Sequence, residues 1–151
     1  MTRNRSVPDA SVIPVLAYAD VPDATEWLCR AFGFQERLRI GRHRAQLVFG
    51  DGAVIVTQLA VVGADPGAAM SLPSTTAATH GVHVRVDDVR AHHEQAVRSG
   101  ARIIHPPADH PYGERQYTAE DPGGHRWTFS ESLADVDPAD WGGTLIELSR
   151  E

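Results

Sequence analysis

An order of predicted elements that occurs twice restricts the fold of this chain more than any other feature of its sequence. The first occurrence begins with an apolar, β-branched stretch at 11–19, which is typical of a strand. Apolar residues then recur at helical spacing between Asp20, which can cap a helix, and Gly33, which can end it. Three stretches that favour strands follow, at 34–40, 45–49 and 53–59.

The second occurrence repeats this order after a segment rich in glycine, proline and serine. Residues 82–86 alternate between valine and polar residues, as a half-buried strand does. Asp88 can cap the helix that follows, Gly100 can end it, and three more strands lead to Phe129. A repeated βαβββ unit of similar spacing predicts an α+β fold made of two modules.

The last two strands form the most distinctive local pattern. The turn Asp121-Pro122-Gly123-Gly124 favours a reversal of the chain, because proline presets one turn position and glycine tolerates positive φ. The turn continues as Asp-Pro-x-Gly-His and then x-Trp-x-Phe, and Tyr-Gly-x-Arg-x-Tyr precedes it from Tyr112. Residues 111–129 are therefore predicted to form a hairpin.

This hairpin resembles the final hairpin of the vicinal oxygen chelate superfamily, which includes glyoxalase I, extradiol dioxygenases, fosfomycin-modifying enzymes and bleomycin-binding proteins. The strand and helix at 82–101 are similar to the elements that precede it in the family, and the resemblance extends from Val12 to about Ser132. It implies a curved mixed sheet around a concave cavity with the helices outside. It also implies a homodimer, since the superfamily resembles a set of twofold dimers whose open sheet edges need covering.

A single domain accounts for a chain of 151 residues. We assign 11–59 to the first module, 60–79 to a connecting loop and 80–132 to the second module. The remaining residues, 133–151, form a C-terminal extension that we expect to dock by its apolar side chains.

Charge and hydropathy exclude several classes of function. The net charge of −6 argues against a nucleic-acid surface, because phosphate recognition needs clustered Lys and Arg. No apolar run approaches the roughly 20 residues that cross a bilayer. The apolar run near the N-terminus is short and contains Pro14, so it is a poor signal peptide. A single cysteine, Cys29, forms no internal disulfide, and we expect a cytoplasmic protein.

Alternation along the strands assigns side chains to the two faces of the sheet. On the last strand, Trp127 and Phe129 are predicted to lie under the helix. The second module then lines the cavity with Gly81, His83, Arg85, Arg126, Thr128 and Ser130. The opposite wall is predicted to come from Ile13, Val15, Ala17, Val54, Val56 and Gln58.

Three residues that precede the turn are further candidates for contacting a ligand. Arg115 lies between Tyr112 and Tyr117, and an arginine beside phenols offers paired donors to an anion and flat surfaces for stacking. The alternative is that Arg115 pairs with a carboxylate such as Glu114 or Glu120 while the tyrosines fill the sheet. The sequence leaves both interpretations open.

Enzymes of the superfamily bind a divalent metal through His or Glu on the first and last strands of the modules. The resemblance places these positions on residues without a charged or imidazole side chain: Ile13, Val56, Gly81 and Thr128. A register shift of one residue would bring His80 to a ligand position close to His83, so a metal at these two histidines remains an alternative. His92 falls on the helix stripe and His125 in the turn, where packing and hydrogen bonding are expected.

Three hypotheses of function follow. The leading one is a metal-free, homodimeric protein that binds a small molecule, either an antibiotic or a metabolite. The second is a metal-dependent lyase, isomerase or dioxygenase with an atypical site at His80 and His83. The third is a subunit or scaffold in which bulky side chains fill the cavity. The site residues of the first hypothesis are His83, Arg85, Tyr112, Arg115, Tyr117, Arg126 and Thr128.

Overall fold

The computed structural model describes residues 4–59 and 79–148, and its elements follow the predicted order. The first module comprises β1 (Val15–Tyr18), α1 (Val21–Phe32), β2 (Gln35–Ile40), β3 (Arg44–Phe49) and β4 (Gly52–Gln58). The second comprises β5 (Val82–Arg85), α2 (Val89–Arg98), β6 (Arg102–His110), β7 (Glu114–Glu120) and β8 (Arg126–Ser132). A 3-10 helix, η1 (Pro138–Trp141), follows. The predicted connecting loop at 60–79 lies outside the described residues, apart from Thr79.

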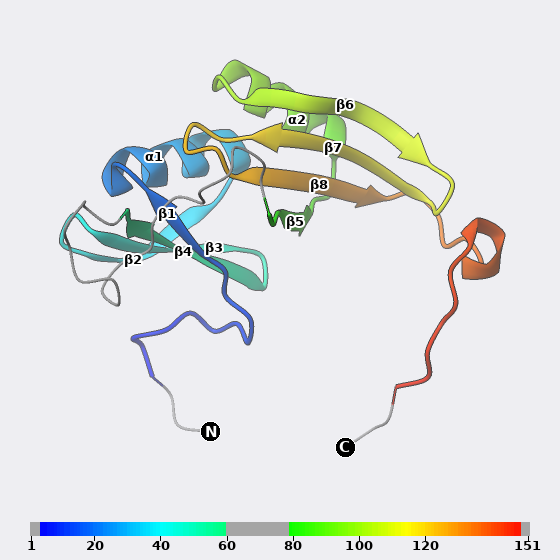
Figure 1. Ribbon diagram of the computed structural model, residues 1–151, viewed down its shortest axis with the longest axis horizontal. Helices are drawn as coiled ribbons and strands as arrows, with labels where there is room; N and C mark the ends of the chain where they lie inside the picture. Colours follow the sequence, from blue (N-terminus) through cyan, green and yellow to red (C-terminus); the bar gives the residue numbers. More distant parts are fainter. Residues whose placement is uncertain (1–3, 60–78, 149–151) are drawn as a thin grey trace.

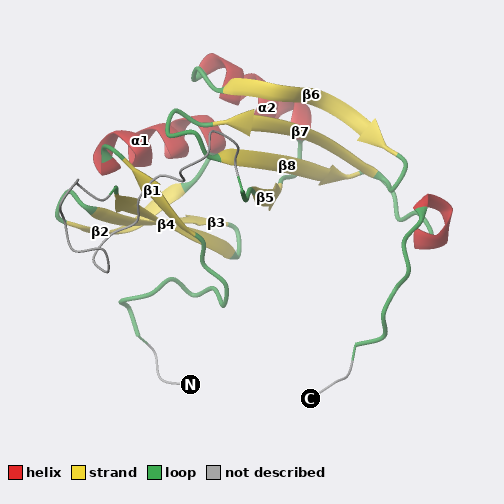
Figure 2. Cartoon of the chain, viewed as in Figure 1, coloured by secondary structure: helices red, strands yellow, loops and turns green. Residues whose placement is uncertain are grey.

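Each module forms one four-stranded mixed sheet, and the α+β fold of two βαβββ modules is confirmed. The strand order is β1-β4-β3-β2 in the first sheet and β5-β8-β7-β6 in the second. In both sheets the first strand pairs in parallel with the last, and the other neighbours are antiparallel. Figures 1 and 2 show the two sheets with their helices and the two chain ends leaving on the same side. We call the face of each sheet that packs on its helix the helix-covered face, and the other the open face.

The local sequence explains where the helices begin and end. A carboxylate oxygen of Asp20 accepts a hydrogen bond from the Asp23 N–H at 3.0 Å, and Asp88 caps α2 in the same way. Gly33 ends α1 with φ of 84°, and Gly100 follows α2 with φ of 87°. Other residues are strained in this left-handed conformation. Among the described residues, no helix is long and apolar enough to cross a membrane.

One hydrophobic core joins the two modules. Trp127 and Phe129 are fully buried, which confirms their prediction for the helix-covered face. Phe32 of α1 packs on both rings, with centroid distances of 5.4 and 4.8 Å. His92 of α2 packs on Phe129 and places Nε2 2.8 Å from the Phe32 carbonyl oxygen. His92 is therefore a packing and hydrogen-bonding residue at the contact between the modules, as its position on the helix stripe predicts.

The turn of the last hairpin makes a second connection between the modules. Asp121 is buried and accepts hydrogen bonds from the Tyr18 hydroxyl, from Trp127 Nε1–H and from two backbone N–H groups of its own turn. His125 Nε2 donates to the Ala17 carbonyl oxygen at 2.8 Å. Both polar residues of the Asp-Pro-x-Gly-His pattern thus hold the second module against β1.

The structure corrects one predicted wall of the cavity. Leu16 pairs with Val56 in the parallel register, and both belong to the core. Val54, Val56 and Gln58 therefore point to the helix-covered face, and Ile55 takes their place on the open face. The prediction was wrong because β4 is apolar from its second to its fifth residue and buried on both faces, so it shows no alternation.

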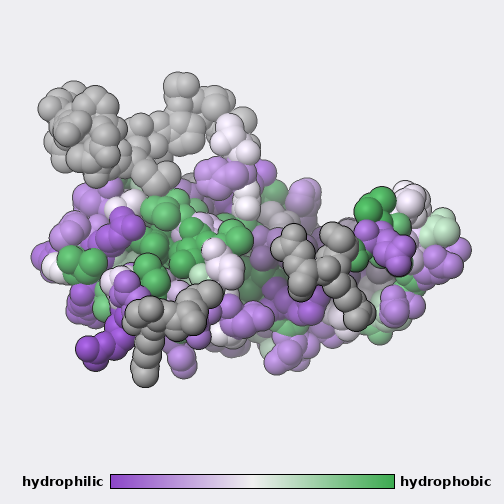
Figure 3. Space-filling model, turned by 90° about the horizontal axis from the view of Figure 1, so that it is seen from below, coloured by the Kyte–Doolittle hydropathy of each residue, from purple (hydrophilic) through white to green (hydrophobic). Residues whose placement is uncertain are grey.

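The N-terminal arm covers part of this open face. Gln46 Nε2 donates to the Ser6 carbonyl oxygen at 2.8 Å, and Arg37 donates to the Arg5 carbonyl oxygen at 3.2 Å. Figure 3 shows hydrophobic residues gathered on the first-module half of the underside, where the arm passes. Two valines of the arm are more than half exposed, Val7 at 51% and Val12 at 84%.

The C-terminal extension contacts the domain through its first part, up to Trp141, whose ring lies 5.8 Å from that of Tyr112. The backbone N–H groups of Leu133 and Ala134 both donate to the Gly113 carbonyl oxygen, at 2.7 and 3.2 Å. Further along, Leu145, Ile146 and Leu148 are 82%, 76% and 84% exposed. The expectation that these apolar side chains pack on their own domain is therefore wrong for the single chain.

Candidate functional site

Two adjoining hollows lie on the open face of the second sheet and along its β5 edge. The first measures about 750 Å³ and is lined from β5, β7, β8 and the turn after β6. The second, about 620 Å³, lies between β5 and the β3–β4 turn of the first module. Asp51, His83 and Arg85 line both hollows. The scaffold hypothesis expects bulky side chains to fill this region, whereas the structure has two open hollows there.

His83 sits between two polar residues of the neighbouring strands. Its Nε2 lies 2.8 Å from the Ser130 hydroxyl oxygen and 4.0 Å from a Glu114 carboxylate oxygen. Ser130 is buried, whereas the His83 side chain remains 54% exposed. Both neighbours approach the same ring nitrogen, so the three do not form a nucleophile, base and orienting acid in series. The arrangement is suited to holding a polar group of a ligand.

Arg85 supplies positive charge at the same place. It lies two residues along β5 from His83, pairs with Ser130 in the strand register and is exposed. It makes no ion pair with any residue in the described part of the chain. Its guanidinium group is thus available to a carboxylate or phosphate, for which it offers paired donors.

An aromatic cluster borders the larger hollow. The rings of Tyr112 and His110 stack at 5.1 Å with an interplanar angle of 10°, and the Trp141 ring meets Tyr112 edge-on at 5.8 Å. Trp141 is still 42% exposed. Tyr112 is therefore correctly placed near the hollow, whereas His110 and Trp141 were missed as its neighbours. The Tyr112-Gly113 pair predicts a turn directly after His110, and this turn places the end of β6 against Tyr112. The same pattern could have indicated His110 as a neighbour.

Arg115 does not reach the hollows, and the ion-pair interpretation describes it better. In the register of β7 and β8 Arg115 pairs with Glu131, two residues from the Tyr117–Phe129 pair, so it lies on the helix-covered face. Its side chain donates two hydrogen bonds to Asp109, at 2.7 and 3.2 Å. These bonds lower the pKa of the Asp109 carboxyl group. The partner is thus Asp109 of β6 rather than Glu114 or Glu120.

Tyr117 also lies away from the hollows. It is fully buried against Phe129, and its hydroxyl oxygen contacts His92 Nδ1. Burial raises the pKa of this phenol, so it stays protonated and can donate to the imidazole. Tyr117 fills the sheet, as the alternative interpretation of the tyrosines states, and is removed from the candidate site.

The two remaining candidates lie on the open face at increasing distance from Arg85. Thr128 pairs with His83 in the strand register, and its hydroxyl lies 3.1 Å from that of Thr118. Arg126 stands one step further along β8, with Nε 3.7 Å from a Glu120 carboxylate oxygen. Thr128 therefore belongs beside the hollows, and Arg126 lies at the far end of the sheet.

The residues at the metal positions of the fold do not fit a metal. Ile55, not Val56, is the true counterpart of Thr128, because Val15 pairs with Ile55 as His83 pairs with Thr128. Isoleucine offers no ligand atom either. Among residues 4–59 and 79–148, no three His, Cys, Asp or Glu side chains come close enough to hold an ion. No chemistry through a metal is therefore derived for this site.

The two histidines of the alternative metal site have different neighbours. The His80 ring lies 6.2 Å from that of His125, whereas His83 contacts Ser130. His125 in turn uses Nε2 for the Ala17 carbonyl oxygen. The structure thus brings His80 to the hairpin turn and His83 to the hollows.

Comparison with known proteins places this geometry in a family. The model of the Glyoxalase/Bleomycin resistance protein/Dioxygenase superfamily matches residues 12–129. The chain belongs to this superfamily. The match covers both modules and ends before the C-terminal extension.

Solved structures of the superfamily fold show the same arrangement. TioX from Micromonospora sp. ML1 is 35% identical, with a TM-score of 0.67 over 82% of this chain and 99% of TioX. A bleomycin-binding protein from Streptomyces verticillus, solved with copper(II)-bleomycin, is 22% identical, with a TM-score of 0.56 over 83% of this chain and 98% of its own. An uncharacterized protein of Mycobacterium bovis is 24% identical over 132 residues, 85% of this chain and 87% of that protein. At these identities the last two support the fold alone.

Proposed function

We propose that this member of the superfamily is a small-molecule binding protein whose ligand is an anion with a flat aromatic part. The observation that carries the proposal is the joint lining of one hollow by His83, Arg85 and Tyr112. Arg85 would pair with the negative charge, His83 would hydrogen-bond a polar group, and the Tyr112 ring would stack on the aromatic part. An antibiotic or a metabolite can have this chemistry, and a relative in fold, the bleomycin-binding protein of Streptomyces verticillus, is a small-molecule binder.

The side chains at the metal positions support binding without a metal. Ile13, Ile55, Gly81 and Thr128 leave a bidentate oxygen substrate with no cation to bind, so recognition depends on Arg85 and His83. The competing hypothesis, a metal-dependent lyase, isomerase or dioxygenase, requires a ligand set that the His80 and His83 positions do not supply together. Elemental analysis of protein purified without chelator and without a histidine tag separates the two. Near-stoichiometric Ni, Zn, Fe or Mn would favour the enzyme.

We further propose that the protein acts as a homodimer in the cytoplasm. The N-terminal arm and the C-terminal extension carry exposed apolar side chains at Val12, Leu145, Ile146 and Leu148, and a second copy would cover them. Light scattering at micromolar concentration tests the dimer, and a monomeric mass would contradict it.

The ligand proposal is tested by a thermal-shift screen over aromatic antibiotics and anionic metabolites. A ligand at 100 times its Kd adds about 2.7 kcal/mol of stability, which is readily detected. Calorimetry on a hit should then show that Arg85→Ala weakens binding by about 2 kcal/mol or more, because the ligand desolvates this guanidinium group. Arg115→Ala is the matched control, since it removes an arginine of the same sheet from the opposite face. Equal effects of the two substitutions, or loss of binding on adding chelator, would contradict the proposal.

A further inference from the structure

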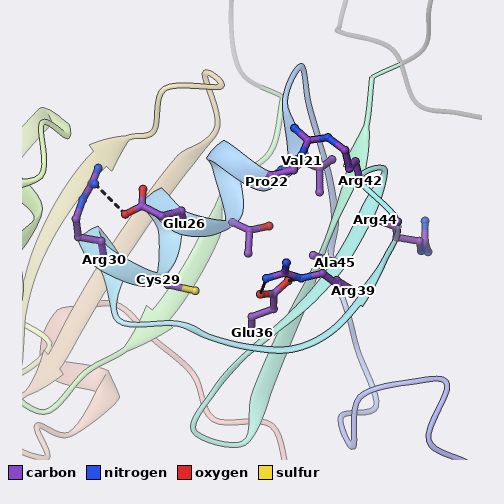
Figure 4. Close-up of a pocket in the computed structure, with 12 residues that line it drawn as sticks. Val21, Pro22, Glu26, Cys29, Arg30, Glu36, Arg39, Arg42, Arg44 and Ala45 are labelled. Atoms are coloured by element: carbon purple, nitrogen blue, oxygen red, sulfur yellow. Dashed lines mark hydrogen bonds and ion pairs between the residues drawn. The ribbon is translucent and has the colours of Figure 1, made fainter.

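A separate hollow of about 570 Å³ lies on the helix-covered side of the first module, between α1 and the strands β2 and β3 (Figure 4). None of its lining residues lines the two hollows on the open face. It is therefore a different place on the molecule from the site proposed above, and its ligand need not be the same.

The floor of this hollow contains a buried hydroxyl group without a partner. Thr25 of α1 is only 6% exposed, and its Oγ1 makes no hydrogen bond in the described part of the chain. Val21 and Ala45 beside it are each 2% exposed. Leaving a buried hydroxyl unpaired is unfavourable, so a ligand that accepts its hydrogen bond would recover that free energy.

Four arginines line the hollow, and two of them, Arg42 and Arg44, make no ion pair with any described residue. Arg44 donates to the Thr57 hydroxyl at 3.5 Å. Arg39 donates two hydrogen bonds to Glu36, and Arg30 pairs with Glu26 at 2.9 Å. Arg42 makes no hydrogen bond or ion pair with any described residue. Figure 4 shows its side chain extending toward Val21 and Pro22 at the start of α1.

We propose that this hollow binds a small amphipathic carboxylate. Arg42 pairs with the carboxylate, the Thr25 hydroxyl donates to one of its oxygens, and the apolar body rests on Val21 and Ala45. Of the two arginines without an ion pair, only Arg42 extends toward Val21 and Pro22 (Figure 4). Because Glu26 and Glu36 also border the hollow, a singly charged carboxylate suits this place better than a doubly charged phosphate.

Cys29 makes this site directly measurable. It lines the hollow one helical turn after Thr25, it is the single cysteine of the chain, and Figure 4 shows its sulfur pointing toward the Glu36–Arg39 pair. Alkylation of the intact protein by iodoacetamide, followed by mass spectrometry, therefore reports on this hollow and not on the open face. Burial raises the pKa of the Cys29 thiol, so the reaction is run at about pH 8.5.

The probes are 1-naphthoate, its neutral analogue 1-naphthamide, and inorganic phosphate. We expect 1-naphthoate to slow alkylation saturably, and the other two to leave the rate unchanged at the same concentration. Arg42→Ala should raise the half-protecting concentration of 1-naphthoate roughly tenfold or more, as expected for losing a charge-assisted contact. Arg44→Ala is the matched control: Arg44 borders the same hollow, but Figure 4 shows its side chain extending away from Arg42, Val21 and Pro22.

Thr25→Val separates recognition from folding. The variant should keep or raise its melting temperature, because the buried hydroxyl it removes has no partner, yet bind 1-naphthoate more weakly. Equal protection by 1-naphthamide or phosphate, no protection by 1-naphthoate, or equal effects of Arg42→Ala and Arg44→Ala would overturn the proposal. None of these results depends on the site around His83 and Arg85, so either proposal can fail alone.

Discussion

Replacing Asp121 by asparagine tests the connection between the two modules. The carboxylate is 4% exposed and accepts four hydrogen bonds: two at Oδ2, from the Tyr18 hydroxyl at 2.5 Å and Trp127 Nε1–H at 3.0 Å, and two at Oδ1, from backbone N–H groups at 3.0 and 2.9 Å. Burial, and next the negative charge of Asp121, raise the pKa of Tyr18, so its hydroxyl remains a donor.

The magnitude follows from which of these bonds an amide can keep. The asparagine oxygen can serve the two backbone donors, which places its NH₂ group against Tyr18 and Trp127. The Tyr18 hydroxyl can rotate and accept, but the indole N–H can only donate, so two donors face each other in a dry site. Each hydrogen bond to a charged group contributes about 1.5–3 kcal/mol. We therefore expect Asp121→Asn to lower the free energy of unfolding by about 3–5 kcal/mol.

Tyr18→Phe is the graded control, because it removes one donor and leaves the other three in place. It should lower the free energy of unfolding by about 1.5–3 kcal/mol. The double variant should lose less free energy of unfolding than the sum of the two single losses, since both substitutions alter the same Tyr18–Asp121 contact. Urea unfolding followed by tryptophan fluorescence, at one fixed protein concentration, measures all three. A loss below about 1 kcal/mol for Asp121→Asn, or a larger loss for Tyr18→Phe than for Asp121→Asn, would refute the role of the Asp121 carboxylate in joining the two modules.

Two other predictions concern the core. Trp127→Ala should lower the free energy of unfolding by about 3–5 kcal/mol in urea titration, since the side chain is fully buried, and an unchanged melting temperature would reverse the assignment of the sheet faces. Burial lowers the pKa of His92, so the unfolded chain takes up its proton first as the pH falls below about 6.5, and stability should decline there by at most about 1.4 kcal/mol per pH unit for this group. Comparison with His92→Gln over pH 5–8 isolates this contribution, and identical pH profiles would contradict it.

The helix ends and the hairpin turn were predictable because each depends on local chemistry. Asp20 and Asp88 cap the first turns of their helices, and Gly33 ends α1 in the conformation that glycine adopts without strain. The alternation of 82–86 likewise gave the correct faces for His83 and Arg85, since one side of that strand is apolar throughout.

The faces of Tyr117 and Arg115 were predictable in principle but were not obtained from each strand taken separately. Counting outward from the turn pairs Tyr117 with Phe129 and Arg115 with Glu131, as the structure has them. Directly paired residues of an antiparallel sheet share a face, so Tyr117 follows Phe129 under the helix. The partner of Arg115 was less accessible, because β6 pairs with register shifts between 103 and 108 that no simple count anticipates.

The hairpin that identifies the superfamily uses its polar residues to build the fold. Asp121 accepts a hydrogen bond from Tyr18, and His125 Nε2 donates to the Ala17 carbonyl oxygen, so both residues bind the first module rather than a ligand. Of the residues that face the hollows, His83 and Arg85 lie on the β5 edge strand, outside that hairpin. A pattern that fixes how two modules meet can therefore predict the scaffold while leaving the ligand open, because recognition depends on other side chains.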